Sequence, residues 1–167
     1  MNFEEIKISS KEERDQFIEL VIADDLIDDL YESIKKFDNP HGNRLAWVMT
    51  SISDKNDQIL SKYVDDLITW LPGIKTQGIK RSLLRGLIHC PLSIDKEGEW
   101  VEFLFDILSS SETDIAVKVH SMELLSKYCE KYPELSQELI IILEDALPYY
   151  SAAGKVRAKR ILKKFSN

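Results

Sequence analysis

Apolar residues recur at intervals of three and four along almost the whole chain, which is the spacing of one face of an α-helix. No stretch alternates convincingly between apolar and polar positions, so the pattern predicts no β-strand. We expect eight or nine helices. Prolines support this division because each falls at a predicted helix border, as a residue that interrupts helices should: Pro72, Pro91, Pro133 and Pro148.

The first predicted helix covers about residues 10 to 22. Ser10 and Glu13 have the spacing of a capping box, in which each side chain binds a backbone N–H at the start of a helix. A second apolar pattern follows from Leu26 to Phe37. Its residues also fit a stripe that continues from the first helix, so the pattern leaves open whether these are two helices or one.

The remaining segments pair into helical hairpins, which we expect to form a single domain over residues 1–167. Loop signals such as the DNPHGN stretch separate successive helices. The predicted hairpins cover about residues 24–53, 57–91, 97–132 and 134–166.

Two independent registers show that the hairpins repeat. Four bases, Arg44, Lys80, Lys118 and Arg157, are separated by 36, 38 and 39 residues. Each is followed four positions later by an apolar residue: Val48, Leu84, Met122 and Ile161. In the preceding helices, Leu30, Leu67, Leu104 and Leu143 align at intervals of 37, 37 and 39 residues. Because each hairpin has apolar residues on more than one face, it must stack on its neighbours to bury them.

The repeat resembles the HEAT-repeat and armadillo-like class, in which an Ile/Val-Lys/Arg pair opens the second helix of each hairpin. The third hairpin matches best, since Asp114 precedes Val117 and Lys118 as the class pattern requires. The second and fourth hairpins depart from it, with Gln77 and no acid in the corresponding stretches. The resemblance covers about residues 24 to 166. It implies a right-handed α-α superhelix of about four hairpins that binds a partner through its concave face or its ends, as a non-catalytic scaffold.

Composition adds a charge asymmetry to this picture. The 167 residues carry a net charge of −7, and residues 1 to 39 alone, with 12 acids and 5 bases, account for all of it. From Ala146 onward there are bases and no acid. We therefore expect a monomer with weak head-to-tail self-association at low salt.

The chain also favours a cytoplasmic protein. It shows no secretion signal and no apolar run of membrane-spanning length. Cys90 and Cys129 lie in helical patterns, where we expect reduced thiols rather than a disulfide.

The four repeated bases are the candidate binding row. The resemblance places them on the second helices, where they could bind an acidic peptide or phosphate groups. Alternatively, they bond turn carbonyls or acids of neighbouring repeats. Arg81, Arg85 and His120 add local density beside the row. Nucleic acid is a second possible partner, since the fold resembles that of the DNA-alkylation-repeat glycosylases, but residues 40 to 167 have no net charge, which disfavours it.

No catalytic, metal or cofactor site is predicted, because His41, His89 and His120 lack metal-ligand spacing and no nucleophile has a base partner. Short helical chains that resemble this one sometimes carry the label adenylosuccinate lyase, so such an enzyme is the alternative. That family has a Ser-Ser-x-Met-Pro-x-Lys-x-Asn loop, whereas the serine run Ser109 to Ser111 continues without Met-Pro.

Two further groups of residues are assigned to structure. Trp47, Trp70 and Trp100 are expected in core or inter-repeat packing. The acid pairs Asp24-Asp25, Asp28-Asp29 and Asp65-Asp66 are expected on solvated helix faces.

Overall fold

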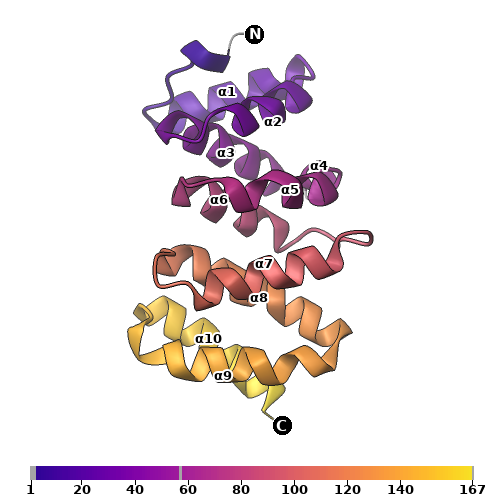
Figure 1. Ribbon diagram of the computed structural model, residues 1–167. Helices are drawn as coiled ribbons and strands as arrows, with labels where there is room; N and C mark the ends of the chain where they lie inside the picture. The colour runs from indigo at the N-terminus through magenta and orange to yellow at the C-terminus, as the bar shows by residue number, and fades with distance from the viewer. Residues whose placement is uncertain (1–2, 57, 167) are drawn as a thin grey trace. The chain divides into compact units, whose positions relative to one another are not determined.

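The computed structural model describes residues 3–56 and 58–166, and within these ranges it contains helices and no strand (Figure 1). This confirms the predicted all-α fold. The α-helices in chain order are α1 (Lys11–Ala23), α2 (Ile27–Lys36), α3 (Pro40–Ser53), α4 (Gln58–Ser61), α5 (Val64–Trp70), α6 (Gln77–Leu87), α7 (Glu97–Ser109), α8 (Ile115–Lys131), α9 (Ser136–Ala146) and α10 (Ala152–Phe165). Short 3-10 helices are η1 (Phe3–Glu5), η2 (Leu71–Gly73), η3 (Pro133–Leu135) and η4 (Leu147–Tyr149). Residue 57, the predicted start of the second hairpin, lies outside the described residues.

The chain divides at Cys90 and Pro91 into two compact units. We call α2, α5, α7 and α9 the first helices, and α3, α6, α8 and α10 the second helices. In the unit before Pro91, α3 packs against α1, α2 and α6. In the following unit, α8 packs against α7 and α10, and α9 packs against α7 and α10. Within each unit the first helices form one layer and the second helices form the other (Figure 1). One right-handed superhelix of all four hairpins stays a prediction.

Both predicted registers consist of core residues. Leu30, Leu67, Leu104 and Leu143 are all 0% exposed, and so are Val48, Leu84 and Met122, while Ile161 is 2% exposed. The repeat therefore places a buried leucine in each first helix and a buried apolar residue in each second helix. Burying such a side chain contributes roughly 1.5–3 kcal/mol, so each of these positions helps to stabilise its hairpin.

The first two helices are separate, which answers the question that the apolar stripe leaves open. Ser10 caps α1 with the predicted capping box, in which the Glu13 N–H donates to the Ser10 hydroxyl and the Glu13 carboxylate accepts from the Ser10 N–H. At the other end, Asp25 has a positive φ of 53°. The Leu26 N–H donates to the Val21 carbonyl at 2.9 Å, and the Asp25 N–H donates to the Ile22 carbonyl at 3.3 Å. These are the two bonds of a Schellman motif, which ends a helix.

The DNPHGN stretch begins a helix as well as ending one. The Asn39 side chain accepts hydrogen bonds from the backbone N–H groups of His41 and Gly42, and Pro40 is the first helical residue of α3. Gly42 lies directly against the Phe37 carbonyl, and a Cβ atom at this position would collide with that oxygen. This close approach joins the end of α2 to the first turn of α3.

Paired aromatic and acidic side chains join α2 to α5. The rings of Tyr31 and Tyr63 stack with their centroids 3.9 Å apart. The Tyr31 hydroxyl donates to the Asp66 carboxylate at 2.7 Å and accepts from Trp70 Nε1 at 3.0 Å. The Tyr63 hydroxyl donates to Asp28 in turn. Asp28 and Asp66 lie on exposed helix faces, as expected, and each carboxylate also connects two helices.

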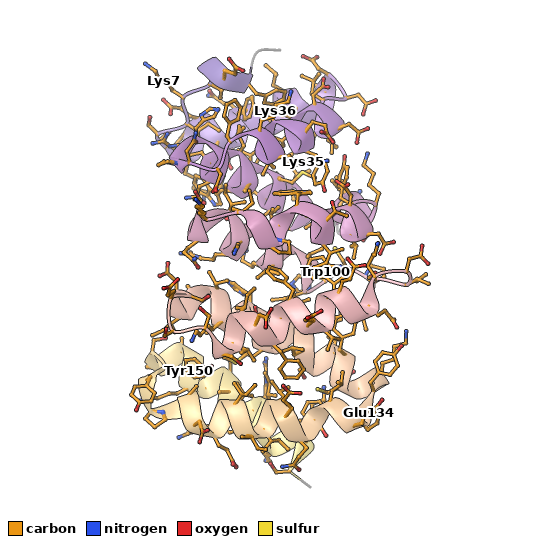
Figure 2. All side chains as sticks on the ribbon, viewed as in Figure 1. Lys7, Lys35, Lys36, Trp100, Glu134 and Tyr150 are labelled. Atoms are coloured by element: carbon orange, nitrogen blue, oxygen red, sulfur yellow. The ribbon has the colours of Figure 1, made fainter. Side chains whose placement is uncertain are left out.

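Ion pairs join the helices of the unit that begins at Pro91. Glu97 on α7 binds Lys131 of α8 and the neighbouring Tyr132. Arg160 and Lys164 of α10 pair with Glu123 and Glu130 of α8. Both bases reach from α10 to carboxylates on the neighbouring helix α8. Figure 2 shows the side chains of the chain on the same ribbon.

Candidate interaction surface

The four bases of the predicted row lie on the four second helices. Arg44 on α3 and Lys80 on α6 belong to one unit, and Lys118 on α8 and Arg157 on α10 belong to the other. Arg44 is exposed, whereas the other three are half-buried. The row thus consists of residues in different environments, and each has to be assessed by its own contacts.

Lys80 participates in a connection between the turns of successive hairpins. Its Nζ donates to the Pro72 carbonyl at 3.3 Å. Burial lowers the pKa of Lys80, and the nearby Asp38 carboxylate raises it. Asp38, at the turn before α3, accepts from the backbone N–H groups of Lys75 and Thr76 at 2.8 and 2.7 Å. These contacts support the alternative role for Lys80, in which the base bonds a turn carbonyl.

Lys118, Arg157 and His120 belong to the other unit. Burial lowers the pKa of the Lys118 ammonium. A half-buried amine of this kind is more costly to keep charged than one in water. His120 on α8 is only 9% exposed, so it lies on the buried face of that helix. The expectation that it adds positive charge to the surface beside the row is therefore wrong.

Arg81 and Arg85 lie one turn apart on α6 and differ in their contacts. Arg81 is exposed to solvent. Arg85 forms an ion pair with Asp54 at 2.9 Å, which bridges α6 to the end of α3. Exposed pairs of this kind contribute about 0–1 kcal/mol, so the pair orients the guanidinium more than it stabilises the fold.

Charge is segregated between the two layers of helices. Among the second helices, α3, α6 and α10 carry bases and no acid. Among the first helices, α5, α7 and α9 carry acids and no base. Within each unit, one layer is therefore rich in cations and the opposite layer is rich in carboxylates. The cation-rich layer favours an acidic partner, and the segregation of charge orients that partner as it approaches.

Trp47 is a surface residue that sequence analysis assigned to packing. Its side chain lies on α3 and is 38% exposed, so the packing expectation is wrong for it. Packing is confirmed for Trp100, which is 2% exposed, and for Trp70, which donates to Tyr31. The sequence contains a signal for this exposure. Trp47 shares one face of α3 with three polar residues at three- and four-residue intervals: Arg44, Ser51 and Asp54.

Arg14 on α1 completes this surface. Its guanidinium carbon lies 4.4 Å from the centroid of the Trp47 ring, a cation–π contact. Arg14 also forms an ion pair with Asp15 at 2.6 Å. The hydrogen bond from Arg14 lowers the pKa of the Asp15 carboxyl.

A hollow of about 440 Å³ lies at the carboxyl ends of α3 and α6. It is lined by Ser53, Asp54, Lys55, Asn56 and His89. Within the described part of the chain, the buried Ser53 hydroxyl has no hydrogen-bond partner. In the described residues no group of three or more His, Cys, Asp or Glu side chains could hold a metal ion.

Comparison with known proteins agrees with the repeat. The family model described as HEAT repeat domain matches residues 6–165, and the chain therefore belongs to the HEAT repeat family. This confirms the family that the repeat resembles. Neither the curated proteins nor the solved structures include a significant match to the chain. None of the described helices has the length and apolar character needed to span a membrane.

Proposed function

We propose that this HEAT repeat protein is a non-catalytic interaction module that binds an acidic protein or peptide through its second helices. HEAT repeats commonly mediate protein interactions, and here the segregation of charge is the observation that supports one layer over the other. The cations of α3 and α6 have no acid on the same helix to neutralise them. A carboxylate-rich partner would gain charge-assisted hydrogen bonds there.

Affinity capture from native lysate tests the proposal when it is done with matched variants. Arg44 and Arg81 are exposed on second helices, while Lys36 is exposed on the first helix α2. Arg44→Glu combined with Arg81→Glu should reduce recovery of the captured partner about tenfold or more. Lys36→Glu makes the same kind of charge change on the other layer and should leave recovery unchanged. Equal recovery with all variants would contradict the proposal.

Nucleic-acid binding is a second candidate function because the same cations could contact phosphates. A salt-dependent shift of short duplex or single-stranded DNA would favour it. The absence of net charge over residues 40 to 167 disfavours it, because proteins that bind nucleic acid usually carry a net positive charge. The enzyme alternative is tested by assaying fumarate release from adenylosuccinate with the purified chain. We expect no turnover; turnover that Lys80→Ala or Lys118→Ala abolishes would overturn the non-catalytic proposal.

A further inference from the structure

We infer that Trp47, Arg14, Arg44 and Arg81 form a docking site for an acidic peptide segment that carries an aromatic side chain between its carboxylates. We call these four residues the Trp47 patch. The inference rests on the proposed function and names the residues and the chemistry of the partner for the unit that ends at Cys90.

The exposed indole is the first observation. Neighbouring positions on α3 such as Leu45, Val48 and Met49 are fully buried, so Trp47 lies outside the core. Arg14 covers part of its ring, and 38% of the residue is still exposed. A large aromatic surface held in place by a stacked guanidinium loses little entropy on binding, and such residues dominate interface energetics.

An ion pair joins the exposed side of α6 to the face of α3 that carries Trp47, because Arg85, one turn after Arg81, pairs with Asp54, which follows Trp47 by two turns. The two helices run side by side, since the Thr50 hydroxyl of α3 donates to the Ser82 carbonyl of α6 at 2.9 Å. First helix α2 packs on α3, and α4 packs on both α3 and α6. The faces of α3 and α6 that carry Trp47 and Arg81 are not covered and remain exposed to solvent. Arg44 precedes Trp47 by one turn on α3, and the exposed Arg81 lies on α6.

The charges of the patch select a carboxylate-bearing partner. The two acids beside it are already bound, Asp15 by Arg14 and Asp54 by Arg85. Arg44 and Arg81 make no ion pair with the described residues, so their two planar guanidinium groups can donate to carboxylates of a partner. A duplex nucleic acid carries one charge per ~1.7 Å and would extend over the acidic α1, where Glu12 and Glu19 are exposed. A short acidic peptide covers less of the surface than a duplex and so meets less repulsion from these carboxylates.

Fluorescence anisotropy with three labelled peptides tests the inference on the full chain at physiological ionic strength. The probes are repeated Glu-Glu-Phe, repeated Glu-Glu-Ser and repeated Lys-Lys-Phe triplets. We expect the Glu-Glu-Phe peptide to bind about tenfold more tightly than the Glu-Glu-Ser peptide, and the Lys-Lys-Phe peptide not to bind. Absence of Glu-Glu-Phe binding, or binding equal to that of Glu-Glu-Ser, would overturn the inference.

Matched variants locate the binding. Trp47→Ala and Arg81→Ala should each weaken binding of the Glu-Glu-Phe peptide about tenfold. Tyr149→Ala removes an exposed aromatic residue from the other unit, Lys36→Ala removes an exposed cation from the first helix α2, and both should leave binding unchanged. Arg81 is a surface residue, so its variant tests the patch even if Trp47→Ala perturbs folding. Equal losses with the control variants, or tighter binding of a duplex DNA of the same charge, would reject the site.

The result can be separated from that of the proposed function. Suppose that the Arg44→Glu, Arg81→Glu double variant loses its captured partner while Trp47→Ala binds the Glu-Glu-Phe peptide normally. The second helices are then the binding layer, and the Trp47 patch is not the docking site. If Trp47→Ala weakens peptide binding but the Arg44→Glu, Arg81→Glu double variant still recovers its partner from lysate, the patch binds peptide and the proposed function fails.

Discussion

The guanidinium of Arg14 stacks on the indole of Trp47, with its central carbon 4.4 Å from the ring centroid. The two residues come from different helices, α1 and α3, and the contact holds an arginine over an aromatic ring that is 38% exposed. The stack gives the chain an aromatic surface bordered by positive charge.

Quenching of tryptophan fluorescence should report this charge directly. Iodide should quench the emission more strongly than caesium at low salt, because the arginines around Trp47 attract an anion and repel a cation. Trp100 is 2% exposed and should be shielded from both ions. Trp47→Phe should remove most of the iodide-sensitive emission. Equal quenching by both ions before the substitution would contradict the positive environment.

Replacing Asp25 by glycine should stabilise the protein. Asp25 ends α1 with a φ of 53°, a region in which glycine is less strained than residues with a Cβ. We expect Asp25→Gly to raise the free energy of unfolding by about 0.5–1 kcal/mol in urea denaturation. Asp24→Gly, at a φ of −94°, is the control and should not stabilise. Destabilisation by both variants would show that the Asp25 side chain matters more than its backbone angle.

Removing the Tyr31 hydroxyl should destabilise the connection between α2 and α5. Tyr31→Phe leaves Trp70 Nε1 without its acceptor and removes one of the donors to Asp66, whose carboxylate keeps its bond from Lys35. We expect the free energy of unfolding to fall by about 1–2 kcal/mol. Tyr149→Phe is the control, because Tyr149 is 78% exposed and its hydroxyl should contribute less than about 0.5 kcal/mol. A Tyr31 variant as stable as the Tyr149 variant would refute the role of the network.

Acid should weaken the same connection. Hydrogen bonds from Lys62 and Tyr63 lower the pKa of Asp28, so in the folded protein its carboxyl binds a proton at lower pH than in the unfolded chain. The stabilisation is therefore present above about pH 4 and is lost as the pH falls through the lowered pKa. Asp28→Asn should reduce the slope of stability against pH in that range. Asp29→Asn, one residue along α2, is the comparison, and a slope reduced equally by both would argue against a specific role of Asp28.

Self-association should be weak and sensitive to salt. Two bases of α10, Arg160 and Lys164, are engaged by α8, so the exposed Lys159 is the main test of a head-to-tail contact. Light scattering should show a monomer at physiological salt and slight association at low salt. Lys159→Glu should abolish that association, whereas Lys36→Glu makes the acidic end more negative and should strengthen it. A dimer indifferent to salt would instead indicate an apolar contact through exposed residues such as Val156, which is 69% exposed.

Sequence alone determined the helices and their repeat, because both depend on spacing along one chain. The three- and four-residue apolar period, the prolines at helix borders and the Ser10–Glu13 capping box are local signals, and the structure reproduces them. The aligned leucines and second-helix residues could be recognised as core for the same reason, since a position that repeats in every hairpin meets the same neighbours.

Tertiary structure decided which side chains are exposed and which charges are paired. The spacing of the bases could not distinguish Arg44, which is exposed, from Lys80, whose ammonium binds a turn carbonyl. The partners of Arg85, Arg160 and Tyr31 each lie more than thirty residues away along the chain, in or at the end of another helix. Trp47 is a surface residue because α1, α2 and α6 pack against other faces of α3 and leave the face that carries Trp47 exposed to solvent. Helical periodicity assigns a face to each residue, but only the packed neighbours determine whether that face is covered.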